Sequence, residues 1–243
     1  MQIPDLIGVR ERRYLDHTGL MRHRDIGDMM RYAALNQGAD MLSEFAGYRP
    51  TAGIAADARF KDDLLPPPEM LERYSDVQLF AIAKYVYSLA PPPNPNPVTD
   101  LSRRGEAIFA REGCGRCLTP PLYTSNKLTP AQGFEIPEEH LRNYDIERTV
   151  VGTDTALTMR TRRGTGYYKI PSLRGVWYRG PFEHSGSVAT LEDWFDPRRL
   201  RNDYVPTGYK GYGVTHRAVP GHPFGINLPP GDKAALIAFL KTL

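Results

Sequence analysis

The stretch that decides the fold runs from Gly105 to Pro121 and reads GEAIFAREGCGRCLTPP. Its first part belongs to an amphipathic pattern that predicts a helix over Leu101–Glu112, with Asp100 as the N-cap. That helix leads directly into Cys114 and Cys117, which are the only 2 cysteines of the chain. A framework of several disulfides is therefore excluded as the main source of stability.

A Cys-x-x-Cys pair followed by His is typical of c-type haem attachment, in which the imidazole binds the iron. Here the next residue is Leu118, whose side chain has no atom that can coordinate a metal. Two other interpretations of the cysteines stay open. One is a redox-active or structural thiol pair, although no strand–helix context accompanies it. The other is a zinc site, which needs four ligands and would have to recruit residues such as His140 and His184.

The composition fits an ordinary globular protein of one large domain or two smaller ones, with 243 residues, 41% hydrophobic and 24% charged. A net charge of +3, from interspersed basic and acidic residues, gives no indication of nucleic-acid binding. No apolar run is long enough to predict a membrane span, and the first residues lack the apolar region of a signal peptide. The arginine-rich segments 160–163 and 198–201 are interpreted as solvated faces.

The periodicity predicts a mainly α fold of short helices joined by many loops, because no segment sustains the alternation of a β-strand. Besides the helix before Cys114, helices are expected over Asp25–Asn36, Ala39–Phe45, Ser75–Leu89, Ala189–Phe195 and Gly231–Leu243. Ser75 and Asp232 are the expected N-caps of two of them. Ordered loops are expected over 118–137 and 203–230, which are rich in Gly, Pro, Tyr and Asn.

The chain also contains an internal repeat. IPDLIGVRERRYLDH at 3–17 aligns with IPSLRGVWYRGPFEH at 170–184, with Ile, Pro, Leu, Gly, Val, Arg and His recurring 167 positions apart. The proline-rich segment 91–97 cannot continue a helix and is interpreted as a linker, or otherwise as an ordered connecting loop. We therefore predict two related units: 1–90, a truncated back half without a haem motif, and 98–243, which contains the cysteines.

The cysteine segment resembles the haem-attachment region of bacterial c-type cytochrome domains. The segment 170–195, IPSLRGVWYRGPFEHSGSVATLEDWF, resembles the di-haem cytochrome c peroxidase superfamily, which includes the methylamine-utilisation di-haem enzymes. The sequences of its members often contain P-S-L-R-N-V followed by Y-F-H-D-G-S-V-A-T-L-E-E. The matching residues are Pro171, Ser172, Leu173, Arg174, Phe182, His184, Gly186, Ser187, Val188, Ala189, Thr190, Leu191 and Glu192. The resemblance covers the second unit almost entirely and extends weakly to the first through the repeat.

The resemblance implies cytochrome c-like helical domains with covalent haem c, in a periplasmic protein that exchanges electrons with a partner the sequence does not identify. One haem c is expected here, in the second unit. Cys114, Cys117, Arg174, Trp177 and His184 are the residues to which the resemblance assigns cofactor binding.

Within that set, His184 is the proposed iron ligand. Arg179 joins Arg174 as a possible partner of the haem propionates, and Met159, His216 and His222 are weaker ligand candidates. Family members include peroxidases, but two missing attachment histidines predict that this chain alone has no peroxidase activity. The alternative is a haem-less cytochrome fold that serves as a structural or interaction module.

Overall fold

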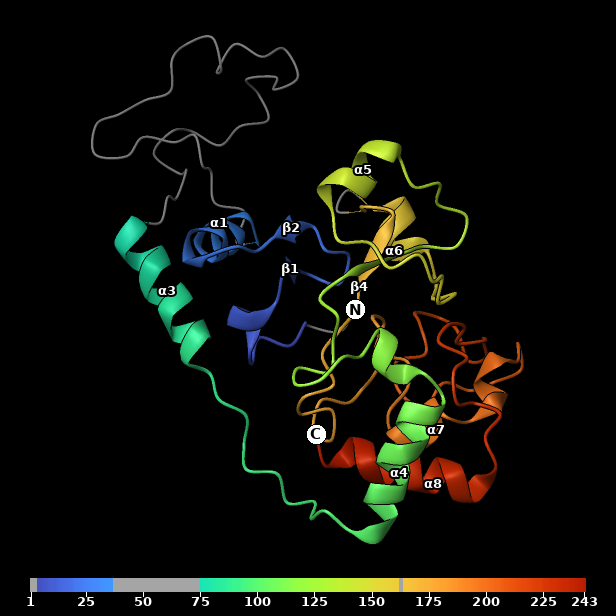
Figure 1. Ribbon diagram of the computed structural model, residues 1–243. Coiled ribbons are helices and arrows are strands. Elements are labelled where there is room, and N and C mark those ends of the chain that lie inside the picture. The colour runs from blue at the N-terminus through green and yellow to red at the C-terminus, as the bar shows by residue number, and fades with distance from the viewer. Residues whose placement is uncertain (1–3, 37–74, 162–163) are drawn as a thin grey trace. The chain divides into compact units, whose positions relative to one another are not determined.

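The computed structural model describes residues 4–36, 75–161 and 164–243. Within them the chain is mainly helical with a few short strands, and the sequence predicts this class (Figure 1). The chain divides into two compact units. The described residues of the small unit are 6–12, 21–36 and 75–90, and all others belong to the large unit. The predicted helix Ala39–Phe45 lies outside the described residues.

The small unit is built on two helices that pack together, α1 (Ile26–Asn36) and α3 (Asp76–Ser88) (Figure 1). The predicted cap Ser75 is confirmed, because its side chain accepts a hydrogen bond from the backbone of Gln78 and the Gln78 side chain accepts one from the Ser75 N–H. A 3-10 turn, η1 (Val9–Glu11), and a short strand, β2 (Met21–Arg22), belong to the same unit.

Two buried polar side chains, Asp28 and His23, make hydrogen bonds within the small unit. The Asp28 carboxylate accepts hydrogen bonds from Arg24 Nε at 2.8 Å and Arg31 Nη1 at 2.9 Å. Because the Arg24 guanidinium stabilises the ionised form, it holds the pKa of Asp28 well below the ordinary range of a carboxyl group. The buried His23 places Nε2 2.5 Å from the hydroxyl of Tyr87, which links the residue after β2 to α3.

In the large unit, α4 (Asp100–Arg111) crosses the last helix, α8 (Pro230–Lys241) (Figure 1). The two backbones approach so closely at Gly105 that a Cβ there would lie 1.9 Å from the carbonyl oxygen of Ala235. With α7 (Leu191–Trp194) they enclose the main core. Its buried members are Ile108, Phe109, Val176, Leu191, Phe195, Ala235, Leu236, Phe239 and Leu240.

The N-cap of α4 is Thr99, so the prediction of Asp100 is wrong by one residue. The Thr99 side chain accepts a hydrogen bond from the backbone N–H of Ser102, and the Ser102 hydroxyl oxygen accepts one from the Thr99 N–H. Asp100 instead occupies the first turn, where its charge is favourable beside the positive end of the helix dipole.

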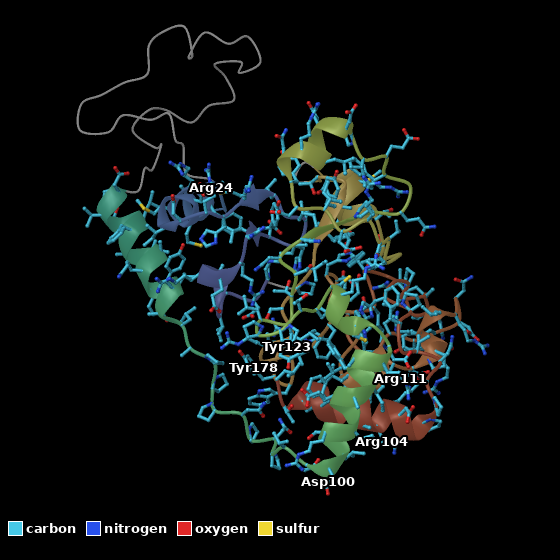
Figure 2. All side chains as sticks on the ribbon, viewed as in Figure 1. Arg24, Asp100, Arg104, Arg111, Tyr123 and Tyr178 are labelled. Carbon is cyan, nitrogen blue, oxygen red and sulfur yellow. The ribbon has the colours of Figure 1, made fainter. Side chains whose placement is uncertain are left out.

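Asp232 is not the N-cap of α8 either, because that helix begins at Pro230 and follows Pro229. It lies in the first turn, where its carboxylate accepts hydrogen bonds from Arg104 and, at 2.9 Å, from Arg111. Figure 2 shows both arginines on α4 beside α8. The residue predicted as a cap therefore joins the two central helices.

The remaining elements of the large unit are short. They are β1 (Tyr14–Leu15), η4 (Cys114–Arg116), β3 (Leu128–Pro130), α5 (Glu138–Asn143), α6 (Ala156–Arg160), β4 (Tyr167–Lys169) and η5 (Pro197–Leu200). β3 pairs antiparallel with β4, with Thr129 opposite Tyr168. A strand of three residues is too short to show alternation, which explains why the sequence predicts only a loop at 118–137. The predicted loop at 203–230 is confirmed up to the start of α8.

The proline-rich segment 91–97 is extended and begins the continuous part of the large unit. At its centre, the Asn94 side-chain amide donates a hydrogen bond to the carbonyl of Lys241 at 2.9 Å. The segment is therefore held at the end of α8 by a specific contact.

The two copies of the sequence repeat share an unusual backbone. Positive φ angles recur 167 positions apart in three pairs: Gly8 and Gly175 (72° and 72°), Asp16 and Glu183 (66° and 70°), Gly19 and Gly186 (66° and 74°). Positive φ is uncommon for residues other than glycine, so its recurrence at an acidic residue is informative. The aligned sequences thus specify the same local chain path twice.

Candidate functional site

The two cysteines lie in the turn that directly follows α4. Gly113 adopts a positive φ of 70°, which ends α4 and starts η4 at Cys114. The carbonyl of Cys114 then accepts hydrogen bonds from the N–H groups of Cys117, at 3.3 Å, and Leu118, at 3.0 Å. Residue 118 therefore lies one helical turn beyond Cys114, and both side chains pack against the main core.

Both thiols are free and half-buried. Burial and the nearby Glu112 raise the pKa of Cys114, and burial and Glu147 raise the pKa of Cys117. A raised pKa keeps each sulfur protonated at neutral pH, whereas redox-active thiols need a lowered one. The local electrostatics therefore disfavour a redox role for the pair.

Half-buried apolar side chains pack around the main core, and Cys114 and Leu118 of the cysteine turn are among them. The ring of Tyr123 lies edge-on to Phe109 and Phe239, with centroids 5.9 and 6.0 Å away. The full set is Cys114, Leu118, Tyr123, Leu173, Phe182, Trp194, Leu228, Ile237 and Leu243. Partly exposed apolar surface of this kind suits the faces of a porphyrin, but aromatic residues are also ordinary core material.

Arg174 and Trp177 lie on the turn after Leu173, with Arg174 exposed and Trp177 half-buried. The guanidinium of Arg179 is paired with Asp5, Nη1 to Oδ2 at 2.8 Å. Arg179, one of the two arginines considered for a propionate, is thus engaged by a carboxylate of this chain.

His184 lies in a tight turn and is held on two sides. Its ring stacks on that of Tyr168, with centroids 5.0 Å apart and planes inclined by 22°. Its Nδ1 lies 2.6 Å from Glu183 Oε1, and neither atom makes an aligned hydrogen bond. No described residue hydrogen-bonds Nε2, so this nitrogen is the one that could reach an external group.

Glu183 is 6% exposed at its side chain. Burial alone would raise the pKa of Glu183, but His184 and the hydrogen bonds from Ser185 outweigh it and lower the pKa overall. The Ser185 hydroxyl donates to Glu183 Oε2 at 2.5 Å. The carboxylate therefore stays ionised beside the imidazole.

Sequence reasoning missed Glu183 and Tyr168 as partners of His184. One signal could have found the first: an acidic residue precedes the histidine in both copies of the repeat, as Asp16–His17 and Glu183–His184. Tyr168 has no such signal, because it comes from β4 and meets His184 only through the fold.

The interpretation of 198–201 as a solvated face is wrong for Arg199, which is 1% exposed. Its guanidinium donates hydrogen bonds to the carbonyls of Trp194, Val219 and His222 at 2.8, 2.7 and 2.9 Å. Nothing in the run R-R-L-R distinguishes the buried arginine from its exposed neighbours. Arg199 thus fixes the long loop before α8.

The weaker ligand candidates differ in burial: His222 is enclosed by aromatic rings, whereas Met159 and His216 are exposed. Burial and the charge of Arg199 lower the pKa of His222 to about 4, so its imidazole is neutral near pH 7. Its ring lies among aromatic neighbours, with centroids 5.4 Å from Trp194 and 5.2 Å from Phe224.

These residues fit covalent attachment of haem c better than they fit ligation of its iron. Two free thiols at the required spacing, beside apolar side chains, suit attachment. Leu118 supplies no ligand atom for the iron. No group of three or more metal-binding side chains occurs among the described residues, so the two cysteines, His140 and His184 do not gather as the zinc interpretation requires.

A surface hollow of about 640 Å³ lies away from these residues, between α8 and the segment after α7. Its lining cations are all engaged: Lys233 bonds the Phe195 carbonyl, Lys241 pairs with Glu192, and Arg198 pairs with Asp196. None of the predicted site residues lines it.

Within the described part of the chain, no helix combines the length and apolar character needed to cross a bilayer.

No family model matches the chain. It is similar to the uncharacterized protein y4iJ of Sinorhizobium fredii, at 32% identity over 147 residues. That match takes in 46% of this chain but 25% of y4iJ, so the chain spans about a quarter of the length of this relative. Among solved structures, it is similar to a MauG-like protein associated with microbial copper homeostasis, with a TM-score of 0.49 and 18% identity over 99% of this chain and 72% of the other.

Proposed function

We propose that the large unit is a c-type cytochrome-like electron-transfer unit that attaches one haem c through Cys114 and Cys117. The observation that carries the proposal is the placement of both free thiols in the turn after α4, with Cys114 against the apolar core. The resemblance of 170–195 to the di-haem peroxidase superfamily supports it. When bound, the haem would supply a one-electron redox couple.

The protein's own contribution would be to hold and surround the group. Cys114 and Cys117 would anchor it, the half-buried aromatic side chains would exclude water from its faces, and Arg174 and Trp177 would contact its edge. His184, oriented by Glu183 and Tyr168, would offer Nε2 to the iron. A periplasmic location and an electron-transfer partner belong to the same proposal and rest on the resemblance.

One observation favours a second candidate function. Leu118 packs on the main core at the position where the family has its iron-binding histidine. A leucine there suits a haem-less unit, in which the fold is kept as a structural or interaction module. Both candidates share the expectation that this chain alone does not turn over hydrogen peroxide.

One experiment separates them. The full chain, fused to an export signal, is coexpressed with c-type haem maturation proteins and analysed by visible spectroscopy and denatured mass. A Soret band and a mass increase of one haem support attachment, and both should vanish in the Cys114→Ser, Cys117→Ser variant. A colourless chain of unmodified mass overturns haem attachment and favours the module.

A further inference from the structure

A path of hydrogen bonds leads from Arg217, in the loop before α8, to the carboxylate beside His184. The Arg217 guanidinium donates through Nη2 to the hydroxyl oxygen of Ser187. The hydroxyl oxygens of Ser187 and Ser185 lie 2.5 Å apart, and the Ser185 hydroxyl donates to Glu183 Oε2 at 2.5 Å. Ser187 is fully buried, and a buried hydrogen bond is electrostatically stronger than one in water. Two segments 30 positions apart are thus joined by one connected path.

The protons of this path have one possible direction. A guanidinium has donors only, so the Ser187 oxygen accepts from Arg217. An ionised carboxylate only accepts, so the single hydroxyl proton of Ser185 is used on Glu183. The bond between the two serines must therefore take its proton from Ser187. Every donor points from the cation towards the carboxylate, and hydrogen bonds in such a sequence strengthen one another.

Ser185 also decides which oxygen of Glu183 faces the imidazole. Its backbone N–H and its hydroxyl both donate to Oε2, at 2.8 and 2.5 Å. The other oxygen, Oε1, is left 2.6 Å from Nδ1 of His184. Two lone pairs would repel each other at that distance, whereas a proton between these atoms is attracted to both.

That proton belongs to the imidazole, because an imidazole is a stronger base than a carboxylate. Nδ1 of His184 is therefore the protonated nitrogen of the neutral ring, and Nε2 carries the lone pair. The path from Arg217 thus ends by selecting one of the two tautomers of the ring.

The loop that carries Arg217 is held against the histidine turn by its backbone as well. The N–H of Gly208 donates to the carbonyl of Ser187 at 3.0 Å. A Cβ on residue 208 would lie 2.2 Å from the carbonyl oxygen of Gly186, so a larger residue there would force the two segments apart. Arg217 also donates through Nε to the Lys210 carbonyl at 2.7 Å, which closes the loop on itself. The loop therefore places Nη2 at the start of the path.

We propose that Arg217 is a positioning residue for His184. Acting through the two serines and Glu183, it fixes the ring proton on Nδ1 and leaves the lone pair on Nε2. The group that Nε2 receives rests on the proposed function, in which it is the haem iron. The tautomer does not, because every contact of the path belongs to this chain, and a failure of haem attachment leaves it untouched.

The test uses the full chain without haem, labelled with ¹⁵N at histidine. Long-range ¹H–¹⁵N NMR at pH 8, where an ordinary imidazole is neutral, shows which ring nitrogen carries the proton. The chain has 6 histidines, and the signals that disappear in His184→Gln identify the ring of interest. We expect a single tautomer of His184 with the proton on Nδ1.

Glu183→Gln should invert this tautomer. The two donors of Ser185 keep the amide oxygen at the position of Oε2, so the amide NH₂ group takes the position of Oε1 and donates to Nδ1. The ring proton must then move to Nε2. Local unfolding would give a mixture of tautomers, so inversion distinguishes selection by the carboxylate from a loss of structure.

Arg217→Met should lower the ratio of the Nδ1–H to the Nε2–H form of His184 by about tenfold, a factor that one hydrogen bond to a charged group can supply. Arg217→Lys should restore most of the ratio, because an ammonium group can still donate to Ser187. Arg201→Met is the matched control, since Arg201 is exposed and pairs with Asp203, and it should leave the ratio unchanged.

Three outcomes overturn the proposal. The first is a wild-type ring with its proton on Nε2 or with both nitrogens protonated. The second is a Glu183→Gln chain that keeps the wild-type tautomer, which would show that the carboxylate does not select it. The third is an Arg217→Met chain with an unchanged ratio, or with a change that Arg217→Lys does not reverse, which would limit Arg217 to holding its own loop.

Discussion

Leu118 lies one helical turn after Cys114, and the two side chains pack on the same apolar core. Any residue at position 118 is therefore directed towards that core by the backbone of the cysteine turn. The sequence places an aliphatic side chain at this position, where the resemblance implies an iron-binding histidine.

Leu118→His should increase the fraction of chain that carries covalent haem after coexpression with maturation proteins, because it restores the Cys-x-x-Cys-His pattern. Without haem, the same variant should lose about 1–3 kcal/mol of unfolding free energy, since a polar ring then faces the core. Denatured mass and urea unfolding measure the two effects. Leu141→His, at an exposed position, is the control and should change neither.

Gly105→Ala should destabilise the large unit, although alanine favours an isolated helix by about 1 kcal/mol over glycine. The added Cβ meets the Ala235 carbonyl, so α4 and α8 must separate, and we expect a net loss of about 2 kcal/mol or more. Chemical denaturation followed by circular dichroism measures it. Gly113→Ala meets no atom within 4 Å, so its cost should be only that of a positive φ, about 1–2 kcal/mol. A stabilised Gly105→Ala chain would contradict the close crossing.

Iodoacetamide should alkylate Cys114 and Cys117 of the folded, haem-free chain several-fold more slowly at pH 7 than the same residues of the unfolded chain. Burial raises the pKa of both thiols, and the thiolate is the reactive form. The rate should rise as the pH is increased past 9. Mass spectrometry of timed samples gives the rates, and a folded chain that reacts as fast as the unfolded one would show that the thiols are not shielded.

Arg199→Met should loosen the loop 203–230, because it removes the donors that bond three backbone carbonyls. Leaving such acceptors unpaired costs about 1–3 kcal/mol each when they stay buried, so the loop should open to water instead. Limited proteolysis should then cut the loop faster. Arg201→Met is the matched control, since Arg201 is exposed and its guanidinium pairs with Asp203 alone among the described residues. Equal cleavage of the two variants would exclude this role for Arg199.

Asp28→Asn should lower the unfolding free energy at pH 7 by about 1–3 kcal/mol, since it removes the charge that Arg24 and Arg31 bind. The folded pKa of Asp28 lies below its ordinary value of 3.8. The stabilisation is therefore complete above pH 4 and is lost as the pH falls towards the folded pKa. Urea unfolding at pH 7 and pH 3 should show a smaller difference between wild type and variant at pH 3. The exposed Asp100→Asn is the control.

Periodicity predicted the helices well where they bury one face. The helix before the cysteines, the helix capped by Ser75 and the last helix all appear within a few residues of their expected bounds. The predicted cap of α4 was wrong because Thr99, Asp100 and Ser102 all lie near its start, and only the backbone decides which one lies outside the helix. The predicted cap of α8 was wrong because that helix begins at Pro230, two residues before Asp232.

The sequence was enough to predict which residues belong to the candidate site. It was not enough to predict which residues they contact. The spacing of Cys114 and Cys117 and the absence of a histidine at 118 were visible in the sequence. The stacking of Tyr168 on His184 and the burial of Arg199 depend on segments far apart in the chain. Such contacts follow from tertiary packing, and no local pattern encodes them.

The hydrogen bond from Asn94 to the Lys241 carbonyl brings the start of segment 91–243 beside its end. A short flexible connection could therefore join residue 243 to residue 91, and new termini could be opened in an exposed loop such as the one around Tyr212. Circular permutation of segment 91–243 would thus keep the crossing of α4 and α8, but it would remove residues 13–20, which belong to the same unit and would have to be supplied as a separate peptide.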